Sequence, residues 1–135
     1  FRFLYYNGDL NPLCPYTGAA EFAREIATSL KMQVKESRKR WLHQKMTGGH
    51  LTRYETTQTD GGKKQLDVVT VKGAGYFAHR DRPGPVAQML TNFFHPKKDG
   101  ASKGYSDYTS VMSFNPGKKP IVQYFGICNQ TLAKT

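Results

Sequence analysis

Two apolar runs that each end at a glycine turn dominate the pattern of hydrophobic and polar positions. Residues 1–6 run into an Asn-Gly turn and then Asp9, and residues 66–72 run into the turn at 73–75 and then Tyr76. Nearly continuous apolar runs of this length are typical of parallel strands that are covered on both faces. The pattern therefore predicts two buried strands, each followed by a tight turn that presents one side chain.

Two segments have apolar residues at helical spacing. The first helix is expected to begin near Thr17 or Ala19, and a second helix is expected to open at Pro83, where a missing amide hydrogen costs no intrahelical bond. The apolar positions of the first are Phe22, Ala23, Ile26, Ala27 and Leu30, and those of the second are Val86, Met89, Leu90, Phe93 and Phe94. Strands and helices that alternate in this way predict an α/β fold.

The rest of the chain offers shorter elements. Between Arg40 and Gln58 we expect two strands around a hairpin turn at residues 47–49, and the next turn at residues 60–62. Residues 96–106 are rich in Lys, Gly and Ser and are interpreted as a linker. It would separate a domain at residues 1–95 from an extension at residues 107–135, in which residues 110–114 and 121–127 could be short strands.

Composition narrows the possible partners. The chain has 135 residues and a formal net charge of +10, which favours contact with anionic surfaces. Its densest basic run, residues 35–40, has no interleaved aromatic residues to stack on bases, so nucleic acid is an unfavoured partner. We interpret this run as a solvated connection between a helix and a strand. No apolar run approaches the roughly 20 residues of a membrane-spanning helix, and neither a P-loop nor zinc-ligand spacing indicates a cofactor or a metal.

A specific set of residues resembles a known family. Tyr5, Asn7-Gly8-Asp9, Cys14, Lys72-Gly73-Ala74-Gly75, Asp81 and Pro83 occur in the order and spacing of the C-terminal part of the serine carboxypeptidases, and Trp41 also resembles the family's spacing. The resemblance covers residues 1–95. It implies the C-terminal part of an α/β-hydrolase domain, with the nucleophilic serine supplied by an upstream segment or a second chain, and a peptide-like ligand.

The resemblance also assigns roles at the two turns. Asp9 stands at the position of the triad acid, although a carboxylate in an Asn-Gly-Asp turn can equally cap local backbone. Tyr76 stands at the position of the triad histidine. A phenol with a pKa near 10 cannot do the work of an imidazole with a pKa near 6.5. The expected protein therefore keeps the architecture, with Asp9 and Tyr76 hydrogen-bonded to each other, but is catalytically impaired and acts as a binding or structural component.

Two other functions remain open. The first is an active serine-type carboxypeptidase in which His79, three residues beyond the lost base, has taken over its role. The second is a basic module that binds polyanions. Efficient hydrolysis of peptides would favour the first function, and a steep salt dependence of binding would favour the second.

Four further residues carry weaker expectations. In the family, Cys14 aligns with a free cysteine that lines a substrate pocket and Phe77 with a methionine there, although each could instead be buried core. Cys128 could form a disulfide with another chain or domain. Asn129 begins the chain's only glycosylation sequon, which agrees with the secreted or lysosomal location that the resemblance implies.

Overall fold

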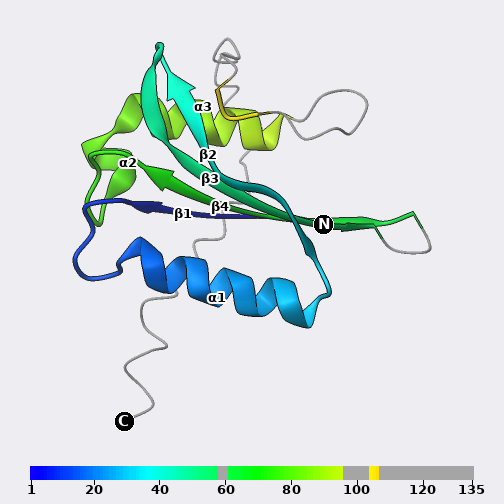
Figure 1. Cartoon of the computed structure of the whole chain (residues 1–135). Helices are drawn as coiled ribbons and strands as arrows, with labels where there is room; N and C mark the ends of the chain where they lie inside the picture. Colours follow the sequence, from blue (N-terminus) through cyan, green and yellow to red (C-terminus); the bar gives the residue numbers. More distant parts are fainter. Residues whose placement is uncertain (58–60, 96–103, 107–135) are drawn as a thin grey trace, which may run out of the picture.

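The computed structural model describes residues 1–57, 61–95 and 104–106. These residues form a three-layer α/β arrangement in which a sheet of order β1-β4-β3-β2 lies between α1 on one face and α3 on the other (Figure 1). The elements are β1 (Arg2–Gly8), α1 (Tyr16–Ser29), β2 (Gln33–His43), β3 (Met46–Thr57), β4 (Lys63–Val71), α2 (Ala78–Asp81) and α3 (Pro83–Phe94). The α/β class expected from the sequence is confirmed for this part of the chain.

The two predicted apolar strands are β1 and β4, and they lie side by side. They pair in parallel from Arg2 opposite Gln65 to Gly8 opposite Val71. Because parallel partners end at the same edge of a sheet, the turns that follow β1 and β4 are neighbours. β3 pairs antiparallel with both β4 and β2, so the sheet is mixed.

The helix α1 begins at Tyr16, one residue before the expected start, and packs on the sheet through small residues. Its buried positions are Ala19, Ala23 and Ala27. Ala23 and Ala27 belong to a cluster that includes Tyr54 and Leu66. Phe22 and Leu30 were expected on this face but are 40% and 38% exposed. Their predicted burial is wrong because a stripe of alanines brings the helix close to the sheet and turns its larger side chains outward.

On the opposite face, α3 covers the larger core through most of its predicted apolar positions, although Phe94 is 48% exposed. Val86 and Met89 are fully buried against Trp41, Val69 and Val71.

At the beginning of β1, the Arg2 guanidinium lies 4.7 Å from the centroid of the Phe93 ring and donates a 2.8 Å hydrogen bond to the Phe93 carbonyl. Within the described ranges, no helix is long and apolar enough to cross a membrane.

The hairpin between β2 and β3 turns earlier than the glycines suggest. The turn lies at Gln44 and Lys45, which both have positive φ angles of 49° and 66°. Gly48 and Gly49 lie inside β3, where an added Cβ would come within 2.4 Å of the Trp41 ring and 1.7 Å of the Thr70 carbonyl oxygen, respectively. These glycines serve close packing, so the predicted turn at residues 47–49 is wrong.

The basic run at residues 35–40 is also different from its expected form. It belongs to β2, the strand at one edge of the sheet, and its residues are exposed apart from the half-buried Glu36. Charged side chains on an edge strand hinder pairing with other chains. The run is therefore part of the sheet, and the expected helix-to-strand connection ends before it.

The segment 104–106 lies at the end of the predicted linker and packs into the core beneath α3. Tyr105 is only 1% exposed. The Gln88 side-chain amide donates to the Tyr105 carbonyl at 2.7 Å, and the Asn92 amide donates to the same oxygen at 3.1 Å. Residues 96–103 and 107–135, which include the predicted short strands, Cys128 and Asn129, lie outside the described residues.

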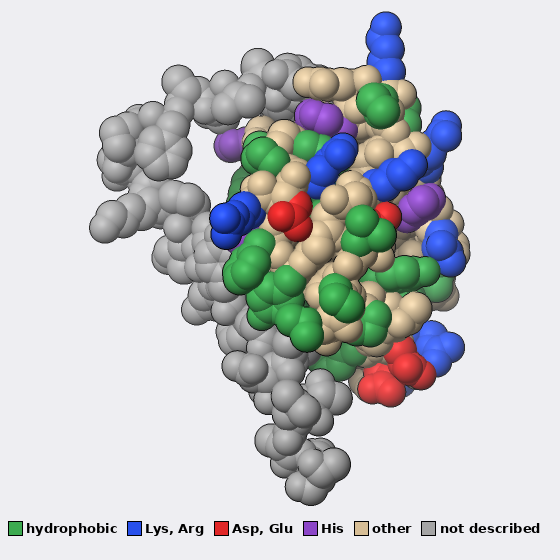
Figure 2. Space-filling view, turned by 90° about the vertical axis from the view of Figure 1, so that its left-hand side faces the viewer, with side chains coloured by type: hydrophobic (Ala, Val, Ile, Leu, Met, Phe, Trp, Pro, Cys, Tyr) green, Lys and Arg blue, Asp and Glu red, His purple; other side chains and the backbone are tan. Residues whose placement is uncertain are grey.

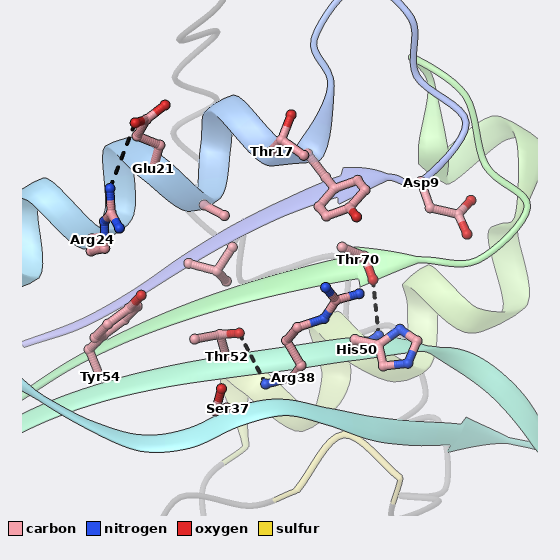
Figure 3. Close-up of a pocket in the computed structure, with 13 residues that line it drawn as sticks. Asp9, Thr17, Glu21, Arg24, Ser37, Arg38, His50, Thr52, Tyr54 and Thr70 are labelled. Carbon is pink, nitrogen blue, oxygen red and sulfur yellow. Dashed lines mark hydrogen bonds and ion pairs between the residues drawn. The ribbon is translucent and has the colours of Figure 1, made fainter.

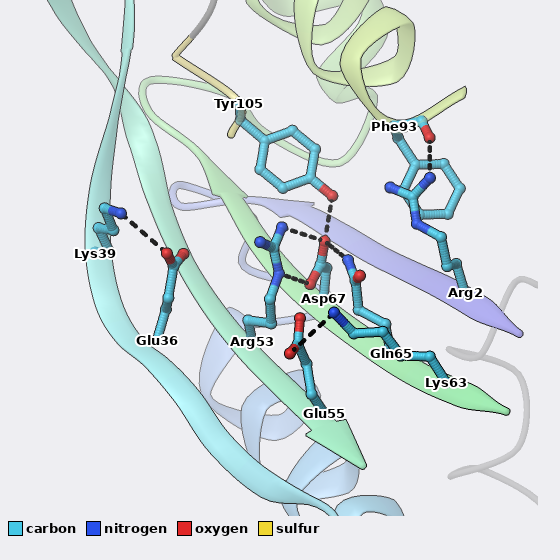
Figure 4. Close-up of polar contacts among 10 residues, drawn as sticks. All are labelled: Arg2, Glu36, Lys39, Arg53, Glu55, Lys63, Gln65, Asp67, Phe93 and Tyr105. Atoms are coloured by element: carbon cyan, nitrogen blue, oxygen red, sulfur yellow. Dashed lines mark hydrogen bonds and ion pairs between the residues drawn. The ribbon is translucent and has the colours of Figure 1, made fainter. Parts of the chain in front are cut away.

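A buried polar network joins this segment to the sheet (Figure 4). Asp67 is completely buried and receives two hydrogen bonds from Arg53, at 2.7 and 2.9 Å. It also accepts from Gln65 at 2.8 Å and from the Tyr105 hydroxyl at 2.6 Å. Burial, together with the neighbouring carboxylate, raises the pKa of Tyr105 far above its ordinary value, so the phenol stays a donor.

Candidate active site

The site is assembled at the edge of the sheet where β1 and β4 end. Gly8 is the last residue of β1 and lies so close to the following turn that an added Cβ would come within 2.1 Å of the Ala74 carbonyl oxygen. The Asp9 amide donates to the Val71 carbonyl at 3.1 Å, and the Leu10 amide donates to the Ala74 carbonyl at 3.0 Å. Backbone bonds therefore join the two turns, as expected if both contribute to one site.

The Asp9 carboxylate faces the second turn. Its Oδ1 accepts a 2.7 Å hydrogen bond from the Gly73 amide, and Gly73 has a φ of 72° that favours glycine. Among the described residues no hydrogen bond joins Asp9 to Tyr76, so the expected bond between them is wrong. The backbone amide of the glycine turn takes that place, because it lies directly across from the acid.

Tyr76 and Phe77 follow this turn and are both open to solvent. Tyr76 is 49% exposed and Phe77 is 54% exposed, and their rings meet edge to face with centroids 4.9 Å apart. Phe77 is therefore not part of the core, and its role as a pocket wall stays a prediction. The turn is also fixed by α2, because the Asp81 carboxylate accepts a 2.8 Å hydrogen bond from the Gly75 amide.

His79 lies on the short helix α2 and is exposed. Its ring contacts Phe77 edge to face, with centroids 6.1 Å apart. No hydrogen bond between His79 and Asp9 occurs in the described part of the chain. Its role as a substitute base stays a prediction.

The loop after Asp9 is fixed by two buried asparagines. Asn11 donates to the Asn7 side-chain oxygen at 2.9 Å, and the Asn7 amide in turn donates to the Cys14 carbonyl. Asn11 Oδ1 also accepts from the Leu13 and Cys14 amides, at 3.1 Å each. The positioning role of Asn11 was not predicted from the sequence, although an Asn-Pro pair after a strand is a recognisable turn signal.

Cys14 differs from both of its expected forms. The structure contains no free cysteine among its described residues, so the expectation of a free thiol at Cys14 is wrong. The residue is also partly exposed, which does not fit a fully buried hydrophobe. Its backbone bonds to Asn7 and Asn11 place it in the loop that holds Asp9.

The face that carries the site includes a group of exposed apolar side chains. Figure 2 shows hydrophobic side chains gathered on the face that lies beyond the ends of β1 and β4. The exposed large hydrophobic residues of the two turns are Leu10, Leu13, Tyr76 and Phe77. Groups of three or more His, Cys, Asp or Glu side chains that could hold a metal ion are absent from the described ranges.

Parallel strands whose carboxyl ends present an acid and a glycine turn define an enzyme-like α/β site. Comparison with known proteins gives the family. The model of the serine carboxypeptidase family matches residues 1–96, and the chain belongs to this family.

Curated relatives agree. The chain is 39% identical over 99 residues to serine carboxypeptidase ctsa-3.2 of Caenorhabditis elegans, which covers 72% of this chain and 19% of that protein. It is 33% identical over 118 residues to ctsa-3.1 of the same organism, with coverage of 86% and 20%. It is 30% identical over 90 residues to serine carboxypeptidase-like 33 of Arabidopsis thaliana, with coverage of 67% and 16%. The chain thus spans about a fifth of the length of these relatives.

Proposed function

We propose that this chain is the C-terminal part of a serine-carboxypeptidase-like protein whose hydrolytic site is impaired, and that it acts as a binding or structural component. The observation that carries the proposal is the placement of Tyr76 directly after the glycine turn that binds Asp9. In the family this position holds the general base. A neutral phenol has almost no power to take the proton of a serine hydroxyl at neutral pH.

The exposed tyrosine supports a binding role in place of catalysis. Tyr76 and Phe77 together present two aromatic rings next to an acid, on a face that also includes Leu10 and Leu13. Such a surface suits a peptide-like ligand with apolar side chains. Hydrolysis of peptides with free C-termini, measured on the native protein, tests the proposal, and the expected result is little or no turnover.

The serine would come from a strand beside β1. β1 is an edge strand in the described sheet, yet it is rich in apolar residues, and Phe3 is 36% exposed. An apolar edge strand is a ready template for a further strand. We therefore propose that an upstream segment or a second chain pairs with β1 and supplies the nucleophile.

Native mass measurement tests this partner. We expect the protein, isolated from its source, to have a mass well above the 15.2 kDa of this chain. Denaturation should release the additional polypeptide if it is a second chain and should leave the mass unchanged if it is an upstream segment. Crosslinking should join the partner to lysines near β1 such as Lys63 and Lys64. A folded 15 kDa monomer with a cooperative unfolding transition would contradict the proposal.

The proposed compartment is the secretory pathway or the lysosome. If this is correct, Asn129 should carry a glycan in the natural protein. The intact mass should then fall after enzymatic deglycosylation, and the deglycosylated Asn129 should be found as aspartate. An unmodified Asn129 in protein isolated from its natural source would count against the secretory assignment.

A further inference from the structure

A second polar site lies on the α1 side of the sheet (Figure 3). It is a pocket of about 660 Å³ between the first half of α1 and strands β2, β3 and β4. A volume of this size lies in the range of small-molecule binding sites. Asp9 lies at one end of the pocket, and Arg38, His50, Thr52 and Thr70 line it from the strands.

A bulge in β2 places two residues of that strand in the pocket. Glu36 pairs with Arg53 and Lys39 pairs with Leu51, so three steps along β2 match two steps along β3. Ser37 and Arg38 therefore both stand opposite Thr52 and on its face of the sheet, whereas regular alternation would send one of them to the other face. Both line the pocket.

The backbone of Arg38 is unusual for the middle of a strand. Its φ is 46°, a left-handed conformation that glycine occupies in the G1 type of bulge. The other described non-glycine residues with positive φ are Lys31, Gln44 and Lys45, which lie at turns between elements. A residue held in this conformation inside an element is characteristic of functional sites.

Hydrogen-bond donors converge beside Arg38. Thr52 Oγ1 accepts the Arg38 amide at 3.3 Å, and Thr70 Oγ1 accepts the His50 amide at 3.0 Å. Because each hydroxyl accepts from backbone, its own proton is available to donate into the pocket. Among the described residues no carboxylate forms an ion pair with the Arg38 guanidinium.

The other end of the pocket offers acceptors. Asp9 lines the pocket and uses Oδ1 for the Gly73 amide, and among the described residues no hydrogen bond reaches its Oδ2. Glu21 and Arg24 on α1 form a 3.7 Å pair with both side chains more than two thirds exposed, so they contribute a solvated rim. The pocket is too large for an inorganic ion alone. One end, at Arg38, can bind an anion, and the other end, at Asp9, can accept a hydrogen bond from a hydroxyl group.

We infer that this pocket binds a sugar that carries one sulfate or phosphate monoester. Arg38, Thr52 and Thr70 hold the oxyanion, for which a guanidinium is geometrically matched, and Asp9 accepts a ring hydroxyl. The site goes beyond the proposed function, although it shares Asp9 with the candidate active site.

Calorimetry on the native protein that contains this chain tests the inference. Glucose 6-phosphate or glucose 6-sulfate should bind, with uncharged glucose at least about tenfold weaker, because hydrogen bonds to charged groups carry much of the affinity. The tighter of the two monoesters identifies the source of the oxyanion. A Tyr76→Phe variant should leave the affinity unchanged, which separates this site from the proposed function.

Arg38→Gly is the informative variant. It removes the guanidinium but suits the positive φ, so we expect an unchanged or higher Tm together with an affinity at least about tenfold lower. Arg40→Ala, an exposed arginine on the same strand outside the pocket, should change the affinity less than about twofold. Arg38→Asn, which also tolerates positive φ, is a second variant if Arg38→Gly folds poorly.

Three results would overturn the inference. These are binding of glucose as tight as that of either monoester, full affinity in Arg38→Gly or Arg38→Asn, and an equal loss in Arg40→Ala. The last result would indicate diffuse attraction to the basic edge strand and no defined site.

Discussion

Replacing Arg53 with methionine should lower the free energy of unfolding by about 3–5 kcal/mol, because it breaks a buried ion pair and leaves the other charge in place. Arg53 and Asp67 are adjacent residues on β3 and β4, with side chains 6% and 0% exposed. After the substitution, Asp67 would keep only its bonds to Gln65 and Tyr105 and would have no cation to balance it. Urea unfolding followed by circular dichroism measures the loss.

Two variants make this result specific. Lys63→Met removes the 3.3 Å pair with Glu55, in which the lysine is 45% exposed, and should cost less than about 1 kcal/mol. The double variant Arg53→Met with Asp67→Leu should recover part of the lost stability, because replacing both charges removes the uncompensated one. The recovery is incomplete because the buried Gln65 amide and Tyr105 hydroxyl lose the acceptor that Asp67 provided. If Arg53→Met costs no more than Lys63→Met, the network does not stabilise the core as argued.

This network could not be predicted from the sequence. Asp67 lies in an apolar strand, and neither its burial nor its partner follows from a local pattern. Tyr105 comes from a Lys-, Gly- and Ser-rich stretch, and its contact with Asp67 spans 38 residues. Long-range polar pairing depends on sheet register, which local propensities do not specify.

The strands and helices with strong local patterns were predictable. β1, β4 and α3 follow apolar runs and a proline start, and their positions agree with the expected ones within a few residues. The hairpin was misplaced because Gly48 and Gly49 resemble a turn, while their real constraints are the Trp41 ring for Gly48 and the Thr70 carbonyl for Gly49. A glycine that is required by packing cannot be distinguished from a glycine that is required by a turn without the neighbouring strand.

The candidate active site was predictable to the same degree. Asp9 and the glycine turn could be brought together from the sequence because the carboxyl ends of neighbouring parallel strands meet. The bond from Gly73 to Asp9 and the supporting role of Asn11 required coordinates. The pocket around Arg38 required them as well, since a bulge that moves one residue to the other face leaves no mark in a run of charged residues.

The second large effect concerns Tyr76. In the native protein, with its serine present, we expect Tyr76→His to raise turnover of peptides with free C-termini by at least about 100-fold, since a positioned general base contributes on the order of 10² to 10⁴. The reason is local. Asp9 already accepts the amide of Gly73, so under the proposed impairment the substitution would supply an imidazole directly after the turn that this acid contacts.

Tyr76→Phe is the matched control. It keeps the ring and removes only the hydroxyl, and the rate should change less than about threefold, because a neutral phenol contributes no base. Labelling by a fluorophosphonate probe should follow the same order, with fast reaction only in Tyr76→His, because an unassisted serine hydroxyl is a weak nucleophile. If Tyr76→His folds as well as Tyr76→Phe but remains inactive, the loss of the general base alone does not explain the low activity.

His79→Ala separates an impaired site from one with a substitute base. In the impaired protein this variant should leave the low activity unchanged, since His79 lies exposed on α2 and contacts Phe77. Loss of one triad member typically costs about 10⁴ to 10⁶ in turnover, so a functional substitute would show an effect of that size. If the unmodified protein hydrolyses peptides efficiently and His79→Ala abolishes this activity, the proposal of an impaired site is contradicted and His79 is the general base.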